Sequence, residues 1–248
     1  PIARSITGKG YQESLNIISD IIPLKKINFT TGEKCFDWTV PKEWNVEEAY
    51  VIDPDGNKIL DFKENNLHLV GYSTPVKARM SLTELNEHLC SLPEKPDAIP
   101  YVHSYYNDWW GFCIAQNERD TLEAGIYEVF IDSKLFEGSL TYGELLIEGE
   151  SQREIFLSTY VCHPSMANNE LSGPVLAAAL ANYLKSKKNN LSYRFIFIPE
   201  TIGAAVYLKR NLKRIRKNLI AGFVLSCVGD NKSYSLINSP YGNNYADK

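Results

Sequence analysis

Several features that would quickly assign a class are missing from this 248-residue sequence. No apolar run approaches the roughly 20 residues that a membrane-spanning helix needs. The formal net charge of -4 leaves no surplus of basic residues. Proteins that bind nucleic acid usually need such a surplus, because their affinity comes largely from contacts with phosphates. We therefore expect neither a membrane protein nor a nucleic-acid-binding protein.

Paired cysteine motifs are also absent. The five cysteines are widely spaced, and no CxxC pair occurs. Disulfide frameworks and thiolate zinc sites both need an arrangement that this spacing does not offer. We expect reduced thiols and a cytoplasmic protein. The chain is long enough for one large domain, or for a domain with a smaller insert.

The spacing of the hydrophobic residues predicts where helices and strands lie. Residues 11–22 carry apolar side chains at helical spacing, and residues 49–60 resemble a hairpin around Asp55-Gly56. The segments 126–131 and 140–146 are interpreted as strands paired with each other. Three nearly continuous apolar runs then alternate with helical patterns, a texture typical of parallel strands buried on both faces. These runs are 155–161, 195–198 and 222–228.

The same pattern predicts the domain organisation. An α/β core is expected from residues 1–35 and 112–248, and a small β-rich insert domain from residues 36–111. Ligands of open α/β folds bind outside the carboxyl ends of the strands. His163, Glu200 and Asp230 follow the three apolar runs, so all three are expected at one edge of the sheet. A histidine with carboxylates is a ligand set that zinc hydrolases use.

Two blocks at these strand ends resemble a known bacterial family. They are His163-Pro-Ser-Met-Ala-Asn-Asn-Glu-Leu-Ser-Gly-Pro174 and Phe197-Ile-Pro-Glu-Thr-Ile-Gly203. Both resemble blocks of the DUF4910 aminopeptidase-like proteins, which are related to zinc aminopeptidases of the M28 type. Segments 37–44, 66–76 and 110–113 resemble the same family, so the likeness extends over nearly the whole chain.

The resemblance implies a fold and a chemistry. The fold would be α/β and phosphorylase/hydrolase-like (zinc-exopeptidase-like), with a mixed sheet, helices on both faces and a small insert. The chemistry would be cleavage of an amide bond by a metal-activated water. By motif position His163 matches the metal-binding histidine and Glu200 the general base. Asn169 falls at the bridging aspartate, and Glu170 and Asp230 complete the candidate metal set.

The sequence departs from the M28 pattern at several positions. Asn169 is neutral where the bridging aspartate would stand, Thr201 replaces the second glutamate of a pair, and Ser226 falls where a strand-end aspartate is expected. No histidine follows His163, so the late histidine ligand of M28 enzymes has no counterpart. The chain therefore resembles a shortened protein. One zinc ion is expected rather than two, and the site of a shortened chain could lack it.

The aromatic segment of the insert has two readings. His103, Tyr105 and Trp110 could wall a substrate pocket, since aromatic faces hold apolar or sugar surfaces. The same side chains could instead form the core of the insert.

Three functions remain open from the sequence. The first is a zinc-dependent aminopeptidase-like hydrolase acting on a peptide or another amide-containing small molecule. The second is a catalytically silent member of the fold that binds a peptide or glycan. The third is a deacylase of N-acyl amino sugars linked to polysaccharide biosynthesis. A homo-oligomer is compatible with all three.

Overall fold

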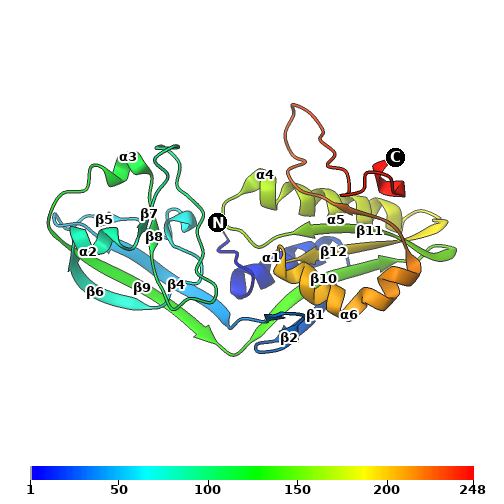
Figure 1. Ribbon diagram of the computed structural model, residues 1–248, viewed down its shortest axis with the longest axis horizontal. Helices are drawn as coiled ribbons and strands as arrows, with labels where there is room; N and C mark the ends of the chain where they lie inside the picture. The colour runs from blue at the N-terminus through cyan, green and yellow to red at the C-terminus, as the bar shows by residue number, and fades with distance from the viewer. Residues whose placement is uncertain (1) are drawn as a thin grey trace. The chain divides into compact units, whose positions relative to one another are not determined.

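The computed structural model describes residues 2–248, which form two compact units. Residues 2–40 and 139–248 make the larger unit, and residues 41–138 are inserted into its chain as the smaller one (Figure 1). The sequence placed the insert at 36–111. The observed unit reaches further along the chain because β9 (Ile126–Phe136) pairs with two strands of the insert and not with the core.

The larger unit is built on a five-stranded mixed sheet with the order β1-β10-β12-β11-β13. β11 pairs in parallel with both β12 and β13, whereas β10 pairs antiparallel with β1 and β12. The three predicted apolar runs therefore belong to the parallel part. The strands are β1 (Lys25–Thr30), β10 (Ser139–Ile147), β11 (Ser151–Tyr160), β12 (Leu191–Ile198) and β13 (Leu219–Val224).

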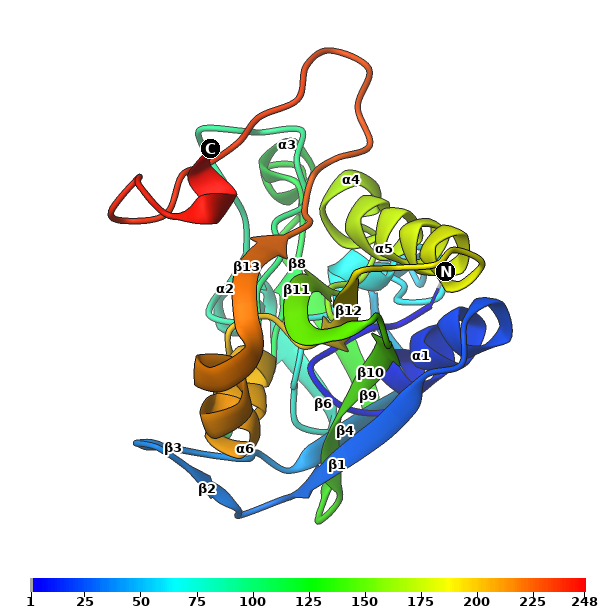
Figure 2. The same cartoon turned by 90° about the vertical axis from the view of Figure 1, so that its right-hand side faces the viewer.

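Helices cover both faces of this sheet, as predicted. In Figure 2, α1 (Lys9–Ile21) and α5 (Ser172–Lys185) lie on one face and α6 (Ile202–Asn218) on the other. The predicted stripe of α1 is confirmed, because Tyr11, Leu15 and Ile18 are buried. α6 buries Val206 and Tyr207, and most of its basic residues are exposed, whereas the half-buried Arg214 donates to the Tyr207 hydroxyl at 2.6 Å.

A buried ion network anchors the sheet at the end away from the parallel strands' carboxyl termini. Arg194 of β12 donates through Nε and Nη2 to Glu154 of β11, at 2.7 and 3.0 Å. Its Nη1 lies 3.0 Å from Glu144 of β10. Because the guanidinium meets carboxylates on both sides, the buried charges are compensated and three neighbouring strands are held in register.

The smaller unit has a four-stranded antiparallel sheet with the order β5-β4-β9-β6. The predicted hairpin is confirmed by the β4–β5 pair, whose turn places Gly56 at φ 87°. The expected pairing of 126–131 with 140–146 is wrong, because the two strands belong to different units. The elements are β4 (Glu43–Ile52), β5 (Lys58–Ile59), β6 (Val76–Ser81), α2 (Leu82–Asn86), β7 (Leu89–Cys90), β8 (Phe112–Cys113) and α3 (Gln116–Arg119).

The remaining elements are short. They are β2 (Lys34–Cys35), β3 (Trp38–Thr39), α4 (Ala167–Glu170) and two 3-10 turns, η1 (Asn66–His68) and η2 (Tyr245–Asp247). Within residues 2–248, no helix has the length and apolar character to cross a membrane.

Candidate active site

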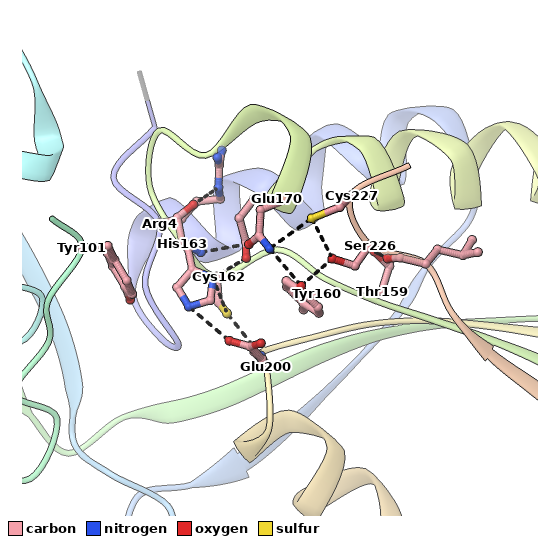
Figure 3. A network of polar contacts seen from close by, with 12 residues as sticks. Arg4, Tyr101, Thr159, Tyr160, Cys162, His163, Glu170, Glu200, Ser226 and Cys227 are labelled. Carbon is pink, nitrogen blue, oxygen red and sulfur yellow. Dashed lines mark hydrogen bonds and ion pairs between the residues drawn. The ribbon is translucent and has the colours of Figure 1, made fainter. Parts of the chain in front are cut away.

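Two strand ends bring the candidate residues together. Because β11 and β12 are parallel neighbours, the segment after Tyr160 and the segment after Ile198 emerge at the same edge of the sheet (Figure 3). His163 Nε2 lies 3.4 Å from Glu200 Oε2. The backbone N–H of Glu200 donates to Cys162 Sγ at 3.2 Å, which ties the two segments to each other.

Glu170 orients the His163 ring. The single turn of α4 carries Glu170 back to the strand end, where the residue is fully buried. Its Oε2 accepts the backbone N–H of His163 at 2.9 Å, and its Oε1 contacts Nδ1 of the same residue. A carboxylate only accepts hydrogen bonds, so Nδ1 carries a hydrogen and donates it to Glu170, which leaves Nε2 facing Glu200. Metal-binding histidines are commonly fixed in this manner by a carboxylate.

Two further buried side chains, Arg4 and Cys162, lie next to His163 and Glu170. Arg4 is buried and donates from Nε to the backbone oxygen of His163 at 2.9 Å. Burial lowers the pKa of Arg4, and the nearby charge of Glu170 opposes that shift. Burial and the same carboxylate raise the pKa of Cys162 well above its ordinary value, so this thiol stays protonated.

A cluster of neutral groups lies beside the His163–Glu170 pair. The Tyr160 hydroxyl hydrogen-bonds Ser226 Oγ at 2.5 Å and accepts Asn169 Nδ2–H at 3.1 Å. Asn169 Nδ2 also contacts Cys227 Sγ at 3.6 Å (Figure 3). The structure thus unites Asn169 and Ser226, two of the positions where the sequence departs from the M28 pattern.

The backbone is strained after each of the three parallel strands. Ser165, Thr201 and Cys227 have positive φ angles of 53°, 54° and 52°. Residues other than glycine rarely have a positive φ angle, and such backbone strain concentrates at functional sites. Because the positive φ angles recur on three loops at one edge of the sheet, the backbone points to a functional site there without reference to any sequence motif.

The Ser172-Gly173 step has a packing role. A Cβ on Gly173 would lie 2.2 Å from the Leu225 oxygen and 2.4 Å from Thr159 Oγ1, so only glycine fits. Ser172 Oγ accepts the backbone N–H of Val228 at 3.0 Å. The motif therefore docks the start of α5 against the segment that follows β13.

The structure brings together only part of the predicted set. His163, Glu170 and Glu200 meet, and Asn169 joins the neutral cluster. Asp230 is exposed and accepts the N–H of Lys232 at 2.9 Å, because β13 ends at Val224, before the predicted run does. Sequence reasoning missed Arg4, which lies 159 positions before His163 in the chain. It also missed Tyr160 and Cys162, which lie just before His163 but match no catalytic or metal-binding pattern.

The aromatic candidates lie in the smaller unit. The His103 ring stacks on Tyr105 at 3.5 Å between centroids, and Trp110 stacks on His88 at 3.6 Å. His103 is exposed, whereas Tyr105 and Trp110 are half-buried. The stacked rings agree with the packing reading, and the role of this segment as a substrate wall stays a prediction.

Comparison with known proteins identifies the family. The model for a domain of unknown function, DUF4910, matches residues 1–248. The chain belongs to the DUF4910 family. A protein of Clostridium acetobutylicum, provisionally named a polysaccharide biosynthesis protein with aminopeptidase-like domain, is 49% identical over the whole chain and 57% of its own length. The DUF4910 chain thus spans just over half of that relative.

Solved structures show the fold. A crystal structure described provisionally as a peptidase of C. acetobutylicum has a TM-score of 0.90 and 51% identity, over 93% of this chain and 54% of that one. A zinc aminopeptidase of Bacillus subtilis matches 91% of this chain and 65% of its own, with a TM-score of 0.59 and 14% identity. A peptidase M28 precursor of Shewanella amazonensis gives 0.56 and 9%, over 88% and 66%. The expected M28-type α/β fold is confirmed.

Two residues of this DUF4910 chain have a spacing that fits ligands of one cation. Zinc–nitrogen and zinc–oxygen bonds of about 2.1 Å in a tetrahedral site separate two ligand atoms by about 3.4 Å. His163 Nε2 and Glu200 Oε2 have that spacing. The neighbouring Tyr160, Asn169 and Ser226 side chains are neutral groups. Cys162, His163 and Glu170 also cluster within 4.8 Å, but Nδ1 and Oε1 contact each other directly and leave no room for an ion between them.

Proposed function

We propose that this domain is the catalytic region of a metal-dependent amide hydrolase of the aminopeptidase-like type. The observation that carries the proposal is the oriented His163 ring, whose Nε2 faces Glu200 because the buried Glu170 carboxylate holds Nδ1. Similarity to zinc aminopeptidases supports it at the level of the fold.

In this proposal His163 and Glu200 hold a single zinc ion. The bound ion would polarise the substrate carbonyl and lower the pKa of a water molecule. Glu200, whose side chain is 48% exposed, would bind the ion through Oε2, and its other carboxylate oxygen would accept the proton of the attacking water and return it to the leaving amine. Two protein ligands are one fewer than catalytic zinc sites usually have, so we expect weaker binding than in those enzymes.

The substrate class follows from the relatives only in outline. A peptide amide is suggested by the aminopeptidase-like fold. The name of the Clostridium relative mentions polysaccharide biosynthesis, and an N-acyl amino sugar is the amide-containing sugar that we add to the assay on that ground. The neutral Tyr160–Ser226–Asn169 cluster offers hydroxyl and amide groups rather than charges to such a substrate.

Activity assays test this function. The chain is supplied with zinc and offered aminoacyl anilides and N-acyl amino sugars, alongside Glu200→Gln and Glu13→Gln. Glu13 is an exposed glutamate of α1, so its variant controls for a simple loss of charge. We expect Glu200→Gln to lose at least 100-fold in kcat, as for removal of a general base, and Glu13→Gln to lose nothing. Equal turnover by both variants contradicts the role of Glu200.

A second candidate is a binding domain without catalysis. Three neutral residues favour it, because by motif position Asn169, Thr201 and Ser226 fall where M28 enzymes have acidic residues. Under this alternative, Glu200→Gln would leave ligand binding and every measured turnover unchanged, and zinc would have no effect on either.

A further inference from the structure

Two cysteines of the smaller unit face each other. β7 and β8 form a short parallel ladder in which Cys90 pairs with Cys113. The ladder is held by Phe112 N–H to the His88 oxygen at 2.8 Å and by Ile114 N–H to the Cys90 oxygen at 3.0 Å. Neighbouring strands lie about 4.8 Å apart, and disulfides bridge Cα separations of about 4.4 to 6.8 Å. The backbone is therefore already at bridging distance.

The side chains meet as well as the backbones. Because Cys90 and Cys113 are directly opposite each other in the ladder, their thiols lie on the same face and each shifts the pKa of the other, and both cysteines are reduced in the structure. Cys90 is half-buried, whereas Cys113 is completely buried. One sulfur can thus be reached from solvent, and its partner is shielded behind it.

Arg119 of α3 is fixed beside the accessible thiol. Its Nη1 donates to the Leu89 oxygen at 3.1 Å and to Ser91 Oγ at 2.9 Å, which brackets Cys90 in the chain. The hydrogen bond from Cys113 lowers the pKa of Cys90 to about 7 against the effect of burial, and Arg119 lowers it further. The hydrogen bond to Cys90 and burial raise the pKa of Cys113. Only the Cys90 thiol is poised to ionise near neutral pH.

We propose that Cys90 and Cys113 form a redox-active pair that small disulfide compounds convert into a reversible intramolecular disulfide. The inference rests on the smaller unit alone and is independent of the hydrolase proposal.

The chemistry is thiol–disulfide exchange. The Cys90 thiolate attacks one sulfur of a small disulfide, which forms a mixed disulfide and expels one thiolate. Cys113 then loses its proton and attacks the Cys90 sulfur, which forms the internal bond and expels the second thiolate. Two protein thiols are oxidised and one small disulfide is reduced to two thiols, so electrons and protons balance.

The pair is linked to the aromatic segment. The oxygen of Gly111, two residues before Cys113, accepts the N–H of Val70 at 3.0 Å. The Val102 oxygen accepts the N–H of Gly71 at 2.9 Å, and the Gly71 oxygen accepts the N–H of Ser104 at 2.8 Å. Oxidation would change a side chain two residues from the Gly111 end of these backbone contacts. It would also close a covalent loop around residues 91–112, which contain His103, Tyr105 and Trp110.

A redox titration of the whole chain tests the pair. The protein is equilibrated in mixtures of reduced and oxidised glutathione, quenched by alkylation, digested and analysed by mass spectrometry. We expect one cross-linked peptide, Cys90 to Cys113, in most molecules at the oxidising end, and its complete reversal by dithiothreitol. Cys227→Ser, which removes an exposed cysteine, should leave this result unchanged.

The reactivity of the Cys90 thiol tests the pair even if formation of the disulfide is slow. The rate of Cys90 alkylation against pH should have its midpoint near 7, and Cys113→Ala should move that midpoint upward by at least one pH unit. Arg119→Gln should move it in the same direction by less. Glutathione attached to Cys90 without the internal bond, or an unchanged midpoint in Cys113→Ala, overturns the proposal.

Discussion

Replacing Glu170 by glutamine isolates the step on which the candidate site depends. The wild-type carboxylate accepts from both the backbone N–H and the Nδ1–H of His163. Glutamine has nearly the same shape, but one of its two terminal groups is a donor. If its oxygen keeps the backbone N–H, its amide group faces Nδ1 and makes Nδ1 the acceptor. The imidazole hydrogen then moves to Nε2, where it blocks the lone pair that a cation needs.

The size of the effect follows from the contacts. Hydrogen bonds to a charged group contribute about 1.5–3 kcal/mol each, and neutral ones about 1 kcal/mol. The substitution also removes the negative charge near buried Arg4. We expect Glu170→Gln to be less stable by about 2–3 kcal/mol, below the 3–5 kcal/mol typical of breaking a buried ion pair outright. For a chain of this length that lowers the Tm by about 4–12 °C.

Urea unfolding gives the stability change, and nitrogen NMR of the imidazole gives the tautomer. Glu13→Gln, with the same change at an exposed position, serves as the control and should stay within about 0.5 kcal/mol of the wild type. A Glu170→Gln protein with wild-type stability and an unchanged His163 tautomer would refute the reasoning.

Two further predictions concern packing and pH. Gly173→Ala should lower the free energy of unfolding by about 2 kcal/mol or more, because the added Cβ would lie 2.2 Å from a backbone oxygen. The nearest contact of a Cβ at Gly222 is 3.8 Å, so Gly222→Ala should lower it by less than about 0.5 kcal/mol. Urea unfolding of both variants measures the difference. Burial disfavours the charge of Glu154, yet the Arg194 hydrogen bond and charge leave its pKa below the ordinary value. A carboxyl pKa depressed in the folded state stabilises the protein above the unfolded pKa of about 4.3, and that stabilisation is lost as the pH falls through the folded value. Glu154→Gln should therefore flatten the fall of stability between about pH 5 and pH 3, and an unchanged slope would contradict the Arg194 pairing.

The sequence predicted the parts of the fold that depend on local pattern. The apolar runs that became β11, β12 and β13 were visible because strands buried on both faces carry few polar residues. The amphipathic stripe of α1 and the Asp55-Gly56 turn were visible for similar reasons. Pairing across the chain was not, so β9 was joined to β10 when its partners are β4 and β6.

The sequence also predicted which residues of the candidate site lie near each other, but not how they are oriented. Strand-end logic placed His163 and Glu200 on one edge, and the structure brings them to 3.4 Å. The orienting contacts of Glu170 could not be derived, because they depend on a one-turn helix that follows a strained residue, Ser165. Asp230 was placed at the edge because the apolar run continues beyond the end of β13.

Zinc stoichiometry tests the central claim most directly. Zinc binding to the chain is measured by calorimetry and native mass spectrometry, beside His163→Ala and the exposed control His103→Ala. The His163–Glu200 arrangement predicts one ion per chain in the wild type and in His103→Ala, and none in His163→Ala. Two ions in the wild type, no binding at all, or full binding by His163→Ala would contradict it.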